Sequence, residues 1–179
     1  IKEVVFGSLR WYSKLFWILQ KTSKRDLISV SAEVRAALVG GTYQIFDAHQ
    51  NDSNRSRVFF NDNGSISFFN RVSNSDTNCH TTGFFRDPSA WYHIVFVADY
   101  TNGTAANRIK MYVNGSQISL NISDDIENAS GQWNGAWSNE IGVIDNGGNP
   151  FDGQMTQIHM IDGQALDPSY FGYTDFQTG

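Results

Sequence analysis

Apolar and polar residues alternate along much of the chain, which is the pattern of strands with one buried and one exposed face. The alternation begins at Leu27, a second run covers residues 42–48, and residues 91–100 form a long central strand. In residues 27–35 the apolar positions are Ile28, Val30, Ala32 and Val34. The central strand places Tyr92, Ile94, Phe96 and Ala98 on one face and Trp91, His93, Val95 and Val97 on the other.

Turn residues separate these runs and predict how the strands are joined. Asp62-Asn63-Gly64 predicts a hairpin over residues 57–70, and Asn114-Gly115 predicts another over residues 108–120, because such turns need positive φ. Residues 73–90 and 121–136 are polar and predict loops, and residues 136–144 predict a return to strand. Asp152-Gly153 and Asp162-Gly163 bound a last strand, which places Met155, Gln157, His159 and Ile161 on one face. A short helical turn follows, opened by Asp167 and Pro168.

These elements predict an all-β fold, a two-sheet antiparallel jelly-roll sandwich of eight or nine strands. The composition agrees, since 40% of the 179 residues are apolar and 14% aromatic while only 17% are charged. Without a sustained helical stripe, a helical bundle is disfavoured. We expect residues 27–179 to form one jelly-roll domain and residues 1–26 to be an atypical segment that serves as an attachment or an interface. We also expect the chain to be a fragment of a longer protein.

Charge is distributed unevenly. The first 35 residues contain seven basic and three acidic residues, a formal charge of +4, and the remaining residues contain six basic and fifteen acidic ones, a charge of −9. The basic end predicts either docking to an acidic partner or an ordinary solvated terminus. The acidic body makes nucleic acid an improbable partner. The single cysteine, Cys79, cannot form an internal disulfide, and no apolar run is long enough to insert into a membrane.

Several sequence motifs carry a resemblance to a known family. Trp91 and His93 open the central strand, Tyr112–Gly115 closes the next one, and Asp162–Leu166 follows the last strand. Together these motifs resemble the concanavalin A-like (laminin G-like) jelly-roll domains of marine phage virion proteins, over residues 33–179. Residues 1–32 depart from that family's opening strands. Since turn formation and packing also explain the motifs, we interpret Trp91 as a core residue and His93 as a hydrogen-bonded structural residue.

The resemblance implies a non-enzymatic virion module, located on a tail fibre, a tail appendage or the capsid surface. Its partners would be other virion proteins and host-surface glycan, and we expect a homo-oligomer. A second hypothesis is a purely structural assembly domain, joined to the particle by its basic, aromatic N-terminal segment. A polysaccharide-active enzyme is a third hypothesis. It is disfavoured because the chain contains no Glu-x-Asp-x-Glu motif of the kind found in the glucanases that share this fold.

Two sets of loop residues are candidates for ligand binding. Calcium is possible at Asp47, Asp52, Asp145 and Asn146, because lectin-like sandwiches hold this ion with loop oxygens; the alternative is that these are ordinary loop residues. The loop over residues 128–139 is the candidate carbohydrate site, since aromatic rings stack on sugars and amides bind hydroxyls. Its candidate residues are Trp133, Asn134, Trp137 and Asn139, with Trp133 preferred because Trp137 could belong to the core.

Overall fold

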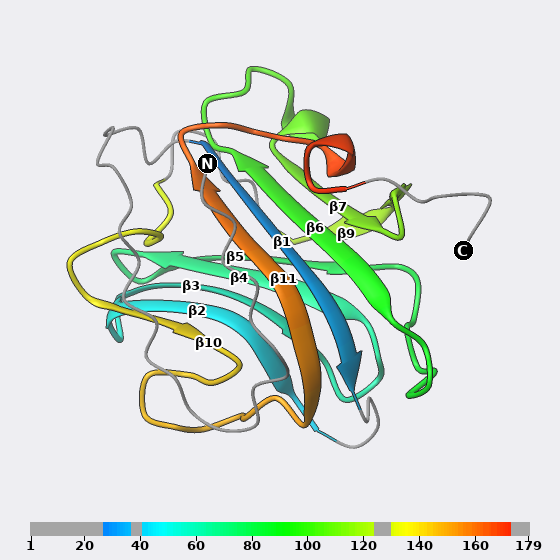
Figure 1. Ribbon diagram of the computed structural model, residues 1–179. Coiled ribbons are helices and arrows are strands. Elements are labelled where there is room, and N and C mark those ends of the chain that lie inside the picture. The colour runs from blue at the N-terminus through cyan, green and yellow to red at the C-terminus, as the bar shows by residue number, and fades with distance from the viewer. Residues whose placement is uncertain (1–26, 37–40, 124–129, 173–179) are drawn as a thin grey trace, which may run out of the picture.

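The computed structural model of the protein describes residues 27–36, 41–123 and 130–172. In these ranges it is an antiparallel β-sandwich, so the predicted fold class is confirmed. Figure 1 shows β11, β1 and β6 side by side, with the strands of the second sheet running in a different direction behind them. The predicted N-terminal segment, residues 1–26, lies outside the described residues. None of the described helices is long and apolar enough to cross a membrane.

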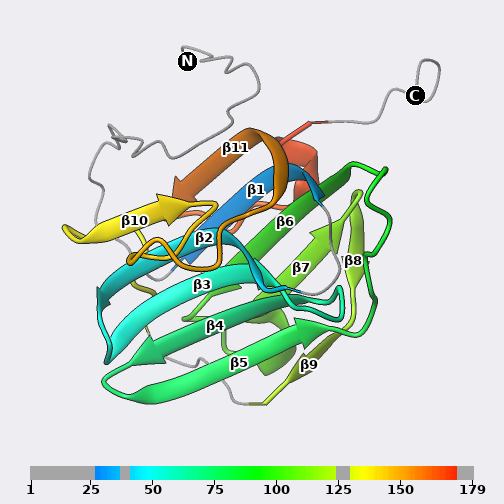
Figure 2. The same ribbon diagram turned by 90° about the horizontal axis from the view of Figure 1, so that it is seen from below.

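The first sheet has five strands in the order β11-β1-β6-β7-β8, and the second has six in the order β10-β2-β3-β4-β5-β9. The bounds of the first sheet are β11 (Gly153–Asp162), β1 (Leu27–Ala36), β6 (Tyr92–Asp99), β7 (Ile109–Val113) and β8 (Ser116–Ile118). Those of the second are β10 (Ser138–Ile141), β2 (Tyr43–Asn51), β3 (Asn54–Phe60), β4 (Ile66–Val72), β5 (Ser75–Thr81) and β9 (Leu120–Ile122). Two short 3-10 helices complete the fold, η1 (Ala105–Asn107) and η2 (Pro168–Tyr170). Figure 2 shows β10, β2, β3, β4 and β5 side by side.

The core lies between the two sheets and is built from the alternate apolar positions of each strand. Phe68 of β4 and Phe96 of β6 meet at its centre, with ring centroids 4.5 Å apart. Trp133 enters from the loop before β10 and stacks on Phe68 at a centroid distance of 6.4 Å. The four residues that the sequence places together on one face of the central strand all lie in this core: Tyr92, Ile94, Phe96 and Ala98.

The predicted hairpins are confirmed. The Asp62–Gly64 turn joins β3 to β4, and the Asn114-Gly115 turn joins β7 to β8. Asn114 and Gly115 have φ angles of 49° and 78°, the left-handed conformation that asparagine and glycine tolerate best. The predicted helical turn is η2, where the Asp167 side chain accepts a hydrogen bond from the backbone N–H of Ser169.

Several predictions were wrong, among them the strand number, since the described residues form eleven strands in place of the eight or nine predicted. Residues 75–81 form β5 and not a loop; the strand reads as polar because its inner side carries Thr77, Cys79 and Thr81 in place of large apolar residues. Trp91 precedes β6 and is 42% exposed, so it is not a core residue. The even alternation in β11 breaks at Gln157, where φ is 49° and the register with β1 shifts. Because of this bulge, Met155 and Ile158 both pack against the core.

Candidate functional site

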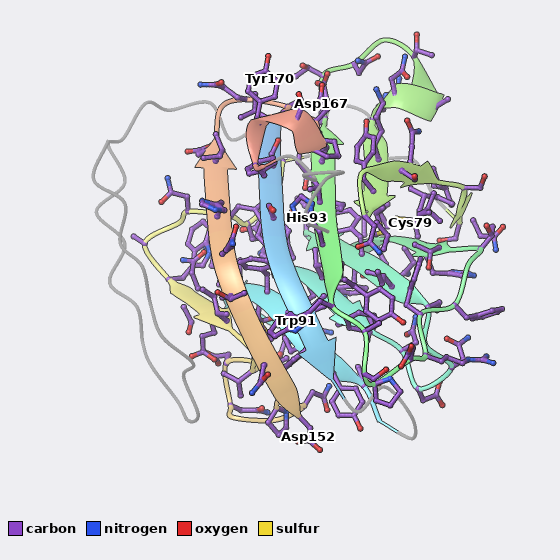
Figure 3. All side chains as sticks on the ribbon, turned by 45° about the vertical axis from the view of Figure 1, so that its right-hand side comes forward. Cys79, Trp91, His93, Asp152, Asp167 and Tyr170 are labelled. Carbon is purple, nitrogen blue, oxygen red and sulfur yellow. The ribbon has the colours of Figure 1, made fainter. Side chains whose placement is uncertain are left out.

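The central part of the outer face of the five-stranded sheet, along β1 and β6, is covered by protein. Ser29 of β1 is fully buried; its Oγ donates to the carbonyl of Gln164 at 2.9 Å and accepts from the N–H of Leu166 at 2.6 Å. Val95 and Val97 point away from the core and are still buried. Figure 3 shows the segment that carries Asp167 and Tyr170 at the end of this sheet. A ligand therefore cannot reach this central part of the sheet.

His93 also lies on the outer face of the five-stranded sheet (Figure 3). Its Nε2 is 2.9 Å from the Oγ of Ser31, which is a hydrogen-bonding distance, and its backbone N–H donates to the Oδ1 of Asn114 at 2.9 Å. The interpretation of His93 as a hydrogen-bonded structural residue is therefore confirmed.

The outer face of the six-stranded sheet is different, because polar and charged side chains from neighbouring strands line up across it. We call it the polar face. Strand register places its side chains in rows perpendicular to the strands. One row is Ser138, His49, Arg55, Arg71 and Asp76; the next is Glu140, Asp47, Arg57, Phe69 and Asn78; a third is Phe59, Ser67, His80 and Asn121.

Two ion pairs hold part of the polar face. The Arg57 Nε donates to the Asp47 Oδ1 within the second row, and the Asp47 side chain is fully buried. Arg71 donates from Nε to Oδ1 and from Nη2 to Oδ2 of Asp76, the second contact at 2.6 Å, which makes a bidentate pair. This hydrogen bonding lowers the pKa of Asp76 and raises that of Arg71.

Phe69 lies between two guanidinium groups on the same face. The Cζ of Arg55 is 5.3 Å from the centre of the Phe69 ring, and the Cζ of Arg71 is 5.4 Å from it. Both distances are within the range of cation–π attraction. The pKa of Arg55 is lowered, first by burial and then by repulsion from Arg57 and Arg71.

The predicted calcium ligands are only partly brought together. Asp47 and Asp145 meet, since the Asp145 N–H donates to the Asp47 Oδ2 at 3.1 Å, while the Asp145 Oδ2 lies 3.1 Å from the His49 Nδ1. Asp52 is 95% exposed at the turn between β2 and β3, and Asn146 accepts from the N–H of Gly148.

These contacts engage both oxygens of Asp47, one with the Arg57 guanidinium and the other with the backbone N–H of Asp145. Calcium binding by the four predicted residues stays a prediction. In the part of the chain that the structure describes, no three His, Cys, Asp or Glu side chains are arranged to hold a metal ion.

The predicted carbohydrate loop is corrected at its preferred residue. Trp133 is 2% exposed, and its Nε1 donates to the hydroxyl of Tyr100 at 3.3 Å inside the core. A ring buried in this way cannot stack on a sugar. Gly131 permits this packing, since a Cβ there would lie 2.3 Å from the indole.

The other three residues of that loop contribute mainly to its own structure. The Asn134 side chain donates to Asp162 at 3.0 Å, and the Asn139 side chain donates to the carbonyls of Gly135 and Trp137. Trp137 is partly buried, and its Nε1 donates to the carbonyl of Gln132 at 2.6 Å. A role of these three residues in sugar binding stays a prediction.

The sequence analysis missed the arginines and the phenylalanine of the polar face. A usable signal was present in the predicted hairpin. Arg57 and Phe69 are equally distant from Asn63, as are Arg55 and Arg71, so a hairpin centred on Asn63 makes each of them a cross-strand pair. Alternation then places all four side chains on one face.

The fold and the polar face define a lectin-type β-sandwich. Residues 20–169 match the family model described as the concanavalin A-like lectin/glucanases superfamily, and the chain belongs to that superfamily. No curated protein matches it significantly.

Similar solved structures share this fold at low sequence identity. The CBM40 module of the Ruminococcus gnavus IT-sialidase has a TM-score of 0.63 and 11% identity, over 82% of this chain and 81% of that chain. A pentraxin of Limulus polyphemus has a TM-score of 0.54 and 18% identity, over 82% and 68%. Domains LG4-5 of the mouse laminin α1 chain have a TM-score of 0.56 and 16% identity, over 83% and 39%.

Proposed function

We propose that this domain is a non-enzymatic carbohydrate-binding module and that its ligand lies on the polar face. The observation that carries the proposal is the set of rows on this face, where guanidinium, carboxylate, imidazole and amide groups lie on adjacent strands. Sugar hydroxyls both donate and accept hydrogen bonds, so a surface that mixes donors with acceptors matches them. On the opposite sheet, the segment after β11 covers Ser29 of β1.

Similar folds support this proposal. The R. gnavus module has been solved with bound α2,3 sialyllactose, so a sandwich of this shape can hold an oligosaccharide. At 12% identity the comparison transfers the fold alone, and the residues proposed to bind sugar come from the polar face of this chain.

The charges of the polar face favour binding over hydrolysis. Glycoside hydrolysis uses two carboxyl groups that flank the scissile bond and can reach it. Asp47 is buried beneath its pair with Arg57, and Asp76 is held by both nitrogens of the Arg71 fork. Of the three carboxylates in the rows of this face, these pairs leave Glu140 alone, and hydrolysis needs two carboxyl groups, so we propose binding without catalysis.

The biological setting that we propose comes from the sequence resemblance. The motifs that end with Asp162–Leu166 favour a virion module of a tail fibre, tail appendage or capsid surface, with host-surface glycan and other virion proteins as partners. We propose a homo-oligomer in that setting. The alternative, a purely structural assembly domain, is favoured by the +4 charge of residues 1–35. It predicts that the chain binds particle proteins and no glycan.

A glycan array probed with the whole chain tests the proposal. We expect binding, and we expect the double variant Asn78→Ala/His80→Ala to bind about tenfold more weakly, since each lost hydrogen bond is worth about 0.5–1.5 kcal/mol. The control, Gln117→Ala, removes an exposed amide from β8 of the other sheet and should bind as the wild type does. If the wild type bound no glycan, the proposal would be wrong. If only the control variant lost binding, the ligand would lie on the opposite sheet.

A further inference from the structure

Basic residues are concentrated on the polar face beyond what the composition suggests. After Arg35 the chain contains only six basic residues against fifteen acidic ones. Three of those six, Arg55, Arg57 and Arg71, lie at adjacent positions of two neighbouring rows. The same two rows also contain the carboxylates of Asp47, Asp76 and Glu140, so the three arginines lie among an equal number of acidic groups.

The placement of these arginines is unfavourable for the isolated sheet. Arg55 of β3 and Arg71 of β4 are directly opposite each other in the strand register. Like charges in this position destabilise a pair of strands. The lowered pKa of Arg55 has the same origin in part, since Arg57 and Arg71 both repel its charge. A sequence selected for stability alone would not require two cations here.

Arg55 has a weaker carboxylate partner than Arg57 and Arg71 have. Asp47 pairs with Arg57 and Asp76 pairs with Arg71. The acidic group beside Arg55 is Asp52, whose Oδ1 is 3.7 Å from Nη1 and whose side chain is 95% exposed. That distance is too long for a hydrogen bond. In addition, the Nε of Arg55 is buried and has no hydrogen-bond partner.

We propose that Arg55 is the anion-binding residue of the polar face, and that the glycan bound there carries a carboxylate or sulfate group. This inference rests on the proposed carbohydrate-binding function and names the class of ligand. A guanidinium presents parallel N–H donors that match a carboxylate or a sulfate. Arg57 and Arg71 strengthen the attraction without leaving their own partners. A bound anion would also offset the repulsion between Arg55 and Arg71.

A structural role for Arg55 makes a different prediction. Its aliphatic stem could simply cover Phe69, in which case truncation would lower stability through lost packing. Under the anion-binding assignment, Arg55→Gln removes a repelling charge and keeps most of the stem. We therefore expect the urea midpoint of the unliganded variant to equal or exceed that of the wild type.

The test uses probes that differ in charge and little else. Isothermal titration of the whole chain compares trigalacturonic acid with its methyl ester, and dextran sulfate with dextran, so the two arms separate carboxylate from sulfate. We expect at least one acidic probe to bind and its neutral counterpart to bind about tenfold more weakly or not at all, with the difference reduced by added salt. Arg55→Gln should weaken acidic binding about tenfold or more, as for loss of a charged hydrogen bond. Arg55→Lys should restore part of it.

Lys110→Gln is the matched control, because it removes one positive charge from the outer side of β7 in the other sheet. We expect it to bind as the wild type does. Equal binding of acidic and neutral probes, or full binding by Arg55→Gln, would overturn the inference, as would a large loss of stability in Arg55→Gln. A chain that binds only neutral glycans on the array would refute the acidic assignment alone. A chain that binds no glycan would refute the proposed function as well.

Discussion

Substitution of Trp133 tests whether the loop before β10 stabilises the fold by placing this ring in the core. The sequence suggested an exposed sugar-stacking ring, but the indole is 2% exposed and lies 6.4 Å from the Phe68 ring and 6.3 Å from the Phe96 ring. A buried tryptophan contributes up to about 250 Å² of buried surface, or about 6 kcal/mol at 25 cal/mol per Å² as an upper limit. Tryptophan-to-alanine substitutions in protein cores cost about 3–5 kcal/mol.

We therefore expect Trp133→Ala to lower the free energy of unfolding by about 4 kcal/mol. Urea denaturation measures this directly, and with a slope near 2 kcal/mol per M the midpoint should fall by about 2 M. Trp133→Phe keeps a ring against Phe68 but loses the hydrogen bond to the buried Tyr100 hydroxyl, so its cost should be about 1–2 kcal/mol. Trp91→Ala is the control, since that ring is 42% exposed.

Two results would contradict the burial of Trp133 in the core. If Trp133→Ala unfolded at the wild-type urea concentration and lost glycan binding, the ring would be a ligand platform and the packing described here would be wrong. If both tryptophan variants lost stability equally, exposure would not distinguish core from surface in this fold.

Three further outcomes follow from local features. Burial raises the pKa of the Cys79 thiol to about 12, so a thiol reagent at pH 8 should label the protein only after unfolding in urea; rapid labelling of the native state would contradict its burial. Arg71 lowers the pKa of Asp76, so this carboxylate stabilises the fold above its unfolded pKa near 3.9 and loses that effect as pH falls through the lower folded value. The stability difference between wild type and Asp76→Asn should therefore shrink at acid pH in urea titrations, and a constant difference would argue against the pair. Gly115→Ala should cost about 1–2 kcal/mol because φ there is 78°, whereas Gly103→Ala should be nearly neutral; equal thermal shifts would contradict the turn assignment.

The sequence predicts those parts of the fold that depend on short-range signals. Asn114-Gly115 sets its own hairpin, because the turn needs backbone angles that few residues adopt. The inner face of β6 follows from alternation alone. Alternation does not predict β5, because its inward residues are not large and apolar. They are Thr77, Cys79 and Thr81, which are small enough to pack beside the large rings of the core. A strand whose inward side chains are small and polar has no alternating apolar pattern by which its sequence could be recognised.

Trp133 and Gln157 show a second reason for the failures. A tryptophan in an Asn- and Gly-rich loop is compatible with an exposed ring that stacks on sugar and with a ring buried between the two sheets. The outcome depends on contacts with Phe68 and Phe96, which are distant in sequence. The bulge at Gln157 likewise depends on register with β1 and leaves no local mark in the alternating sequence. The polar face is an intermediate case. Hairpin symmetry about Asn63 predicts how its arginines line up, but the carboxylates that pair with them lie on β2 and β5, outside the hairpin.

We expect substitutions of the arginines on the polar face to have different effects on stability and on ligand binding. Arg57 neutralises the fully buried Asp47, and removing one partner of a buried pair costs about 3–5 kcal/mol, so a substitution there should damage folding and binding together. Arg55 has no such carboxylate, and its charge opposes those of its neighbours. A residue that costs stability in the unliganded protein is typical of a binding site, where the missing partner arrives with the ligand. Phe69 contacts both kinds of arginine. The guanidinium of Arg71, which is paired with Asp76, lies over this ring, and so does that of Arg55, which the ring holds in position to bind an anion.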